Sequence, residues 1–241
     1  MDAPLDNLKR LFDEHAFVGI PVTDAADQLV GVVRRASVEE AIRERATEWF
    51  LAVSGLAGEE ELRTMPVVQR SRRRLSWLSI NIGLNIIAAS VIAFYQDTLA
   101  AVIALAVFLP IISDMSGCSG NQAVAVSIRE LSLGLVKPYE FVRVVWKEGA
   151  VGVMNGLVLG ILLGTVAALW KGNIFLGLVV GTALMLNTIL AVLLGGLIPL
   201  ALKGLRQDPA VAAGPILTTV TDMVGFFLVL SFASLLLPRL T

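Results

Sequence analysis

Asp222 is an acidic side chain in the middle of an apolar stretch, residues 209–238. An aspartate at the centre of a membrane-spanning helix costs about 2.5–3.5 kcal/mol to insert. No Lys or Arg lies inside any long apolar stretch, so protonation, water or a bound cation must compensate the charge. Thr218, Thr219 and Thr221 add oxygens nearby, and such ligands suit a hard cation, Mg²⁺ or Ca²⁺. The alternative is a protonated Asp222 that bonds to a neighbouring helix.

A second polar stretch, residues 110–122, interrupts another apolar region and contains Asp114, Asn121 and Gln122. Its proline and glycines predict a discontinuous helix. Irregular backbone at membrane depth is tolerated only where it is buried in protein or lines a cavity, and exposed carbonyls often build ion sites there. Cys118 has no cysteine partner and is interpreted as a small filler. The alternative is a cytoplasmic loop that ends a short second helix.

Glycines at every fourth position predict close contacts between helices. Four of them share one stripe of a predicted helix: Gly152, Gly156, Gly160 and Gly164. Asn155 and Asn187 lie in apolar surroundings and are interpreted as hydrogen-bonding partners between helices. The sequence has no nucleophile–histidine pair, no zinc-binding pattern and no phosphate-binding loop, so we predict that the protein is not an enzyme.

The elements that must position these residues are membrane-spanning helices. The chain has 241 residues, of which 56% are hydrophobic and only 16% charged, whereas soluble domains carry about 25% charged residues. Because a bilayer core needs about 20 apolar residues per helix, the apolar runs predict an all-α membrane protein with five spans. These lie near residues 75–95, 99–128, 149–170, 174–202 and 211–237. We expect no cleavable signal peptide before the first span.

Basic residues predict the orientation of the spans, because Lys and Arg gather on the cytoplasmic side. One side has only Lys171 and Arg239. The other side holds Arg70, Arg72–Arg74, Arg129, Lys137, Arg143, Lys147, Lys203 and Arg206. We therefore expect a multi-pass protein of the plasma (inner) membrane, with a cytoplasmic N-terminus and an external C-terminus. The net charge of −1 argues against a nucleic-acid partner.

Residues 1–74 hold 11 of the 19 basic and 13 of the 20 acidic residues, which predicts a polar cytoplasmic part. Residues 1–54 form a small α+β module in the order helix, strand, turn, strand, helix, and Ser37 is predicted to cap the second helix. The runs IPV (residues 20–22) and LVGVV (residues 29–33) resemble the second half of a CBS domain. Residues 55–74 are predicted to form a connector with a basic, amphipathic end, and residues 75–241 the transport domain.

Three segments of the membrane part resemble the MgtE family of magnesium channels and transporters, which is related to solute carrier family 41. They are residues 110–122, which end in SGNQ, residues 208–210 (DPA) and residues 214–222 (GPILTTVTD). The resemblance implies a homodimer with five helices per subunit and a pore on its two-fold axis, lined by the second and fifth helices.

The resemblance also implies roles for single residues. Asp222 would bind a largely hydrated Mg²⁺, with Thr218, Thr219 and Asn121 shaping its site. The pore lining and the cytoplasmic mouth would include Asp114, Gly120, Gln122 and Asp208. Mg²⁺ is then the transported ion, and we expect no other cofactor. Members of the family usually carry two CBS domains, whereas the resemblance here covers part of one.

Two other functions stay open at this point. One is transport of a different divalent cation, such as Co²⁺ or Mn²⁺, although no cluster of Cys, His or Met near Asp222 favours a softer metal. The other is a non-conducting sensor or scaffold in the membrane, in which the CBS-like module would be the active part. In both alternatives the chain is still embedded in a lipid bilayer.

Overall fold

A computed structural model describes residues 3, 5–53, 65–132, 135–137, 139–205, 207 and 209–240. The chain divides into two compact units, Met1–Met65 and Pro66–Thr241. The predicted residue Asp208 lies outside the described residues.

The N-terminal unit has the predicted order of elements. Helix α1 (Leu5–Glu14) precedes strands β1 (Gly19–Thr23) and β2 (Leu29–Arg34), which pair antiparallel, and helix α2 (Arg35–Val53) follows. The Asp24 carboxylate accepts hydrogen bonds from the backbone of Ala26 and Gln28, which holds the turn between the strands. The Arg35 guanidinium donates to the carbonyls of Phe12 and His15, and so ties α2 to the end of α1.

The predicted start of the second helix was wrong. Helix α2 begins at Arg35, so Ser37 lies inside its first turn and is not the capping residue. Strand β2 runs directly into the helix at this point, and the backbone N–H of Arg35 donates to the carbonyl of Val18. That bond, to the residue just before β1, satisfies one of the free N–H groups at the helix start, which the capping side chain was expected to do.

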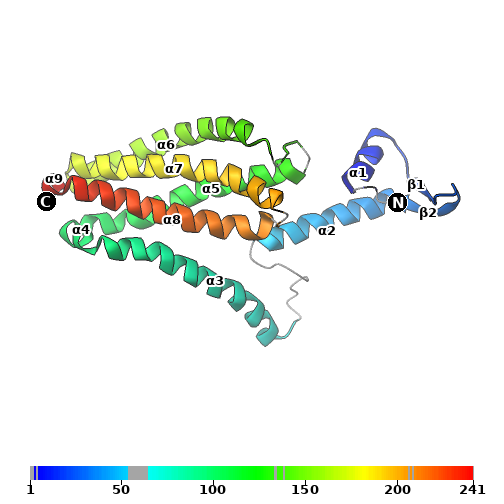
Figure 1. Cartoon of the computed structure of the whole chain (residues 1–241), viewed down its shortest axis with the longest axis horizontal. Coiled ribbons are helices and arrows are strands. Elements are labelled where there is room, and N and C mark those ends of the chain that lie inside the picture. Colours follow the sequence, from blue (N-terminus) through cyan, green and yellow to red (C-terminus); the bar gives the residue numbers. More distant parts are fainter. Residues whose placement is uncertain are drawn as a thin grey trace. The chain divides into compact units, whose positions relative to one another are not determined.

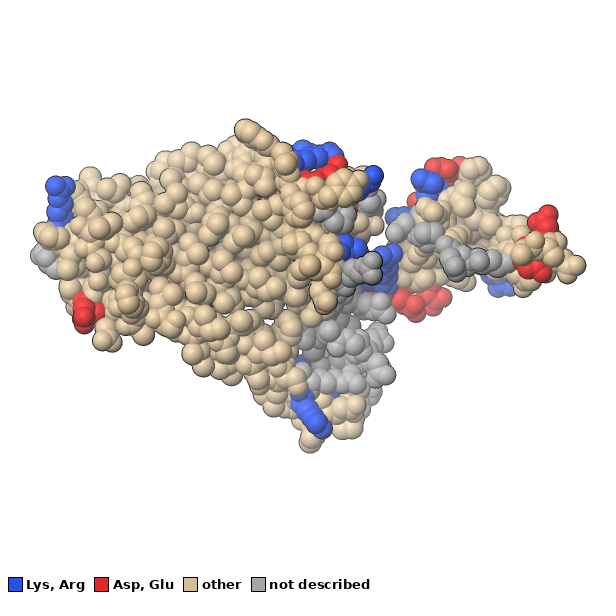
Figure 2. All heavy atoms as spheres, in the orientation of Figure 1, with Lys and Arg blue, Asp and Glu red and all other residues tan. Residues whose placement is uncertain are grey.

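The membrane unit contains five helical segments long and apolar enough to cross a bilayer, which confirms the predicted number. On the face drawn in Figure 2, its charged residues gather at the ends, and the surface between them is uncharged. Its elements are α3 (Val67–Phe94), α4 (Gln96–Ala101), the 3-10 helix η1 (Ile103–Val107), α5 (Leu109–Ser132), α6 (Phe141–Lys171), α7 (Ile174–Gly204), α8 (Pro209–Leu235) and α9 (Leu237–Leu240) (Figure 1).

The predicted discontinuity of the second span lies elsewhere. Helix α5 runs unbroken through the polar stretch 110–122, so neither a broken helix nor a loop forms there. Pro110 is accommodated in the first turn, where its missing N–H leaves no bond unmade. The backbone is irregular earlier, at Val102 (φ −129°, ψ 70°), between α4 and η1. Glycine disfavours a helix, but at Gly120 packing offsets that preference, since this residue is buried against α7 and α8.

Helices α6 and α7 lie side by side along their lengths (Figure 1), and the predicted stripe of glycines lies in their contact. A Cβ atom on Gly156 would lie 2.7 Å from the Met185 carbonyl oxygen, and one on Gly160 would lie 2.7 Å from that of Gly181. A Cβ on Gly164 would lie 2.8 Å from the carbonyl oxygen of Gly177. Any side chain at these positions would push the two backbones apart.

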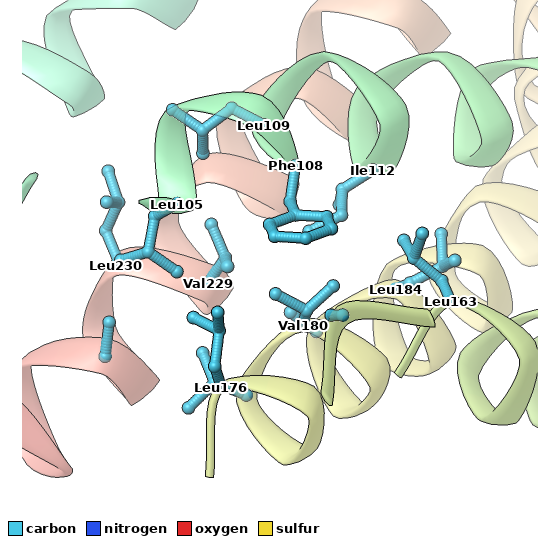
Figure 3. Packing of buried hydrophobic residues seen from close by; sticks show 14 of the residues in the cluster. Leu105, Phe108, Leu109, Ile112, Leu163, Leu176, Val180, Leu184, Val229 and Leu230 are labelled. Atoms are coloured by element: carbon cyan, nitrogen blue, oxygen red, sulfur yellow. The ribbon is translucent and has the colours of Figure 1, made fainter. Parts of the chain in front are cut away.

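The main apolar core lies where η1, α5, α6, α7 and α8 meet. Figure 3 shows Phe108 at its centre, facing Val180 of α7. Phe108, Leu105, Ile112 and Val180 are completely buried, and Val229 and Leu230 bring α8 into the same cluster. Helix α3 contrasts with this group, because only 6% of its most apolar 18-residue segment is buried. The core therefore fixes α5, α7 and α8 against one another.

The α6–α7 contact predicts a clear stability difference between two glycines. Gly160→Ala should lower the stability of the protein by about 1–3 kcal/mol, because the added methyl group overpacks the contact. The measurement is the thermal unfolding midpoint of the purified protein in detergent. Gly83→Ala is the matched control: Gly83 has open space around it on α3, and alanine favours a helix, so the midpoint should not fall. Equal midpoints for the two variants would contradict the packing role.

Candidate functional site

The Asp222 side chain lies between two helices. Asp222 belongs to α8 and is buried, with 8% of its surface exposed. Its Oδ1 atom accepts a hydrogen bond of 2.5 Å from the Ser113 hydroxyl of α5. This hydrogen bond gives the Asp222 carboxyl group one partner on a neighbouring helix.

The threonines near Asp222 use their hydroxyl hydrogens on their own helix. Thr219 donates to the Pro215 carbonyl (2.8 Å), and Thr221 donates to the Thr218 carbonyl (3.0 Å). A hydroxyl that has donated its hydrogen presents only lone pairs to other partners, which is the arrangement a cation requires. Thr218 is exposed one turn before Asp222, Thr219 is half-buried and Thr221 is buried.

Polar residues form an exposed stripe on α5. Asp114, Cys118, Asn121 and Gln122 are all exposed and recur at helical spacing, and the Cys118 sulfur lies 4.0 Å from Oδ1 of Asp114. Polar side chains in a spanning helix normally face water or another protein segment rather than lipid. We call these four residues the α5 polar stripe.

Gly120 lies apart from the α5 polar stripe. It is buried between two neighbouring helices, and a Cβ there would meet the Ala191 carbonyl oxygen at 2.9 Å and the Leu217 side chain at 2.8 Å. On the other side of this contact, a Cβ on Gly195 would lie against the carbonyl oxygen of Gly120. The close approach fixes how α5 is rotated against α7, and thereby which of its residues are exposed.

Two polar residues near Asp222 make hydrogen bonds between helices, and the sequence singled out Asn187 but not Ser113. Ser113 was one of several polar residues in the stretch 110–122, and nothing in its type separated it from Ser116 or Ser119. Asn187 makes the predicted hydrogen bond between helices: its amide donates to the Thr221 carbonyl at 3.0 Å. The signal for Asn187 was its position in an apolar run. Ser113 could have been identified only by knowing which side of α5 faces α8.

One chain supplies few metal ligands at this place. Among the described residues, no group of three or more His, Cys, Asp or Glu side chains could hold a metal ion. Asp222 is therefore a single carboxylate with hydroxyl and carbonyl oxygens around it. Mg²⁺ keeps several of its waters when bound and requires only one or two carboxylates, so this donor set fits it better than it fits Ca²⁺, which takes six to eight oxygens.

Comparisons with known proteins give the same class of molecule. The family model for MgtE, described as a divalent cation transporter, matches residues 109–232. A relative named Magnesium transporter MgtE from Bacillus subtilis is 32% identical over 229 residues, which cover 95% of this chain and 51% of the relative. Relatives of the same name from Enterococcus faecalis and Thermus thermophilus are 33% and 32% identical and are covered to 50% and 52% of their lengths.

The chain thus spans about half the length of the curated relatives it matches. The residues that match the family model run from the start of α5 into α8, and they include the α5 polar stripe, Ser113 and Asp222. Helices α5, α6 and α7, most of α8, and the buried carboxylate therefore lie in the part that matches the family model, and the chain belongs to the MgtE family of divalent cation transporters.

Proposed function

We propose that the chain moves Mg²⁺ across the plasma membrane and that Asp222 is the central ligand of the moving ion. The proposal rests on the Asp222 carboxylate, which is buried on a spanning helix and accepts a hydrogen bond from the Ser113 hydroxyl. The span that carries Asp222 contains no basic residue. The donor set around it suits a hydrated hard cation. The relatives named as magnesium transporters support the choice of ion.

The pathway is proposed to lie on the two-fold axis of a homodimer. Among the described residues one chain offers a single buried carboxylate, and two copies would place two carboxylates about one axis, where a divalent cation between them relieves their repulsion. The α5 polar stripe needs water or protein beside it, and a pore shared by two copies supplies both. Asn121, Gln122, Asp114 and the Thr218 and Thr219 oxygens are then the groups that line the way to Asp222.

The orientation is proposed from the basic residues. Lys and Arg are denser at the end of the unit that holds the start of α3 and the α5–α6 connection, whereas Lys171 and Arg239 are the basic residues at the other end. The first end is therefore assigned to the cytoplasm. With five spans, the C-terminus is external. Asp208, in the family's DPA segment just before α8, is assigned to the cytoplasmic mouth.

The N-terminal unit is proposed to be a partial CBS-like module, residues 1–54, followed by a connector, residues 55–74. Its helix–hairpin–helix order matches the resemblance seen in the sequence. Asp222 and the α5 polar stripe both belong to the membrane unit. We therefore assign transport to residues 75–241 and only a modulating part to the module.

Replacement of Asp222 tests the proposal directly. Asp222→Ala should reduce Mg²⁺ uptake into liposomes that contain the purified chain to the level of empty liposomes, because the ion loses the buried carboxylate proposed to bind it. Asp97→Ala, at an exposed acid on α4, is the control and should keep uptake within about twofold. Native uptake in folded Asp222→Ala would exclude the proposed ligand. The same assay with Co²⁺ and Mn²⁺ tests whether the chain selects another ion.

Cys118 offers a test of the pathway and of the dimer without any engineered cysteine, since it is the one cysteine of the sequence and is exposed. A positively charged, water-soluble methanethiosulfonate should modify it and inhibit Mg²⁺ uptake, because the added charge enters the pathway. A flexible bis-maleimide should join two chains into a species of twice 25.7 kDa. Cys118→Ser should resist both reagents. Modification of Cys118 with uptake unchanged would place the α5 polar stripe outside the pathway.

Removal of residues 1–54 distinguishes the transporter from a sensor or scaffold. The shortened chain should keep the rate of Mg²⁺ uptake within about threefold, because no residue of the proposed pathway belongs to the module. The comparison uses equal amounts of folded protein in liposomes, quantified by gel filtration. Loss of uptake in a shortened chain that is still folded would assign the essential part of the function to the N-terminal module.

A further inference from the structure

Two hydrogen bonds from two different helices meet at one turn of α8. The Ser113 hydroxyl of α5 donates to the Asp222 carboxylate at 2.5 Å, and the Asn187 amide of α7 donates to the Thr221 carbonyl at 3.0 Å. Thr221 and Asp222 are neighbours in the chain, so the side chain and the preceding backbone group are held separately. Asn187 and Thr221 are completely buried.

A glycine makes the second of these bonds possible. A Cβ atom on Gly225 would lie 2.6 Å from the Asn187 amide nitrogen and 3.3 Å from a methyl carbon of Ile112. Gly225 is one helical turn after Thr221, and only a residue without a side chain leaves the Asn187 amide room to reach the Thr221 carbonyl. The amide orientation follows from chemistry, because only the NH₂ end can donate to a carbonyl oxygen.

The Asn187 amide is not explained by packing. Its Oδ1 is buried and has no hydrogen-bond partner among the described residues. A buried acceptor without a protein partner destabilises a fold, whereas a leucine of similar size would fill the same space without that penalty. Asn187 stands on a helix whose buried neighbours are mostly apolar. The Asn187 amide instead supplies the N–H donor that bonds to the carbonyl of Thr221, the residue before Asp222.

We propose that Ser113 and Asn187 are positioning residues that together fix the Asp222 carboxylate for a hydrated divalent cation; this inference rests on the proposed function. Ser113 occupies Oδ1 and leaves Oδ2 for the water shell of the ion. Asn187 holds the α8 backbone, so that the carboxylate stays in place when the ion binds or leaves. Groups that orient a metal-binding side chain in this way typically change metal affinity by 10- to 100-fold when they are removed.

The Ser113 variants decide the proposal, measured as Mg²⁺ uptake by the full chain in liposomes over a range of Mg²⁺ concentrations. Ser113→Ala should raise the half-saturating concentration about tenfold or more, with the maximal rate per folded protein within about threefold. Ser113→Thr keeps a hydroxyl and should restore the native concentration. A variant that is merely misfolded would lower the maximal rate and leave the half-saturating concentration unchanged.

The Asn187 side is tested with two variants that act differently. Asn187→Leu removes the donor, and Gly225→Ala keeps the donor but displaces it from the Thr221 carbonyl. Both should raise the half-saturating concentration as Ser113→Ala does. Asn85→Leu is the matched control, because the Asn85 amide is exposed on α3 and bonds within its own helix, and it should behave as native.

The outcomes distinguish failure of the positioning role from failure of the proposed function. Native half-saturating concentrations in folded Ser113→Ala, or equal concentrations in Ser113→Ala and Ser113→Thr, would overturn the positioning role while Asp222→Asn still abolishes uptake. Native uptake in Asp222→Asn would instead overturn the proposed function itself. If Asn187→Leu does not fold, Gly225→Ala and the Ser113 pair still give the answer.

Discussion

The membrane unit depends on one constraint: a carboxylate must be kept inside an apolar helix without a basic partner. The hydrogen bond from Ser113 meets part of this need, because it supplies a donor to the charge where water is scarce. The remaining oxygen must be satisfied from outside the described contacts. Neighbouring helices are arranged so that this one charge can be accommodated.

Close backbone contacts carry that arrangement from one helix to the next. Gly120 and Gly195 let α5 and α7 approach until the backbone of one helix touches the other, and Gly225 of α8 leaves room for the Asn187 side chain of α7. Each contact sets a rotation as well as a distance. The rotation of α5 decides that Ser113 faces α8 while Asp114, on the next residue, is exposed.

Hydropathy and charge were sufficient to predict the five spans, and the type of Asp222 with its threonines was sufficient to select the candidate site. The sequence failed where packing overrides local preference: the glycines of residues 110–122 predicted a broken helix, but Gly120 is held in α5 by its neighbours on α7 and α8. Ser113 could not be separated from the other serines of that stretch, because helix rotation depends on contacts far apart in the sequence. The cap at Ser37 failed because β2 leads directly into α2.

The short link between α6 and α7 has a consequence for the order in which the protein folds. Gly172, with φ 64°, ends α6, and Asn173 caps α7 by accepting hydrogen bonds from Phe175 and Leu176. Helices α6 and α7 are joined by two residues and pack against each other through their glycines. Two helices linked in this way lose little chain entropy when they pair. We expect this hairpin to assemble before α8 has left the ribosome, so that the aspartate arrives last, at a surface where its asparagine neighbour is already in place.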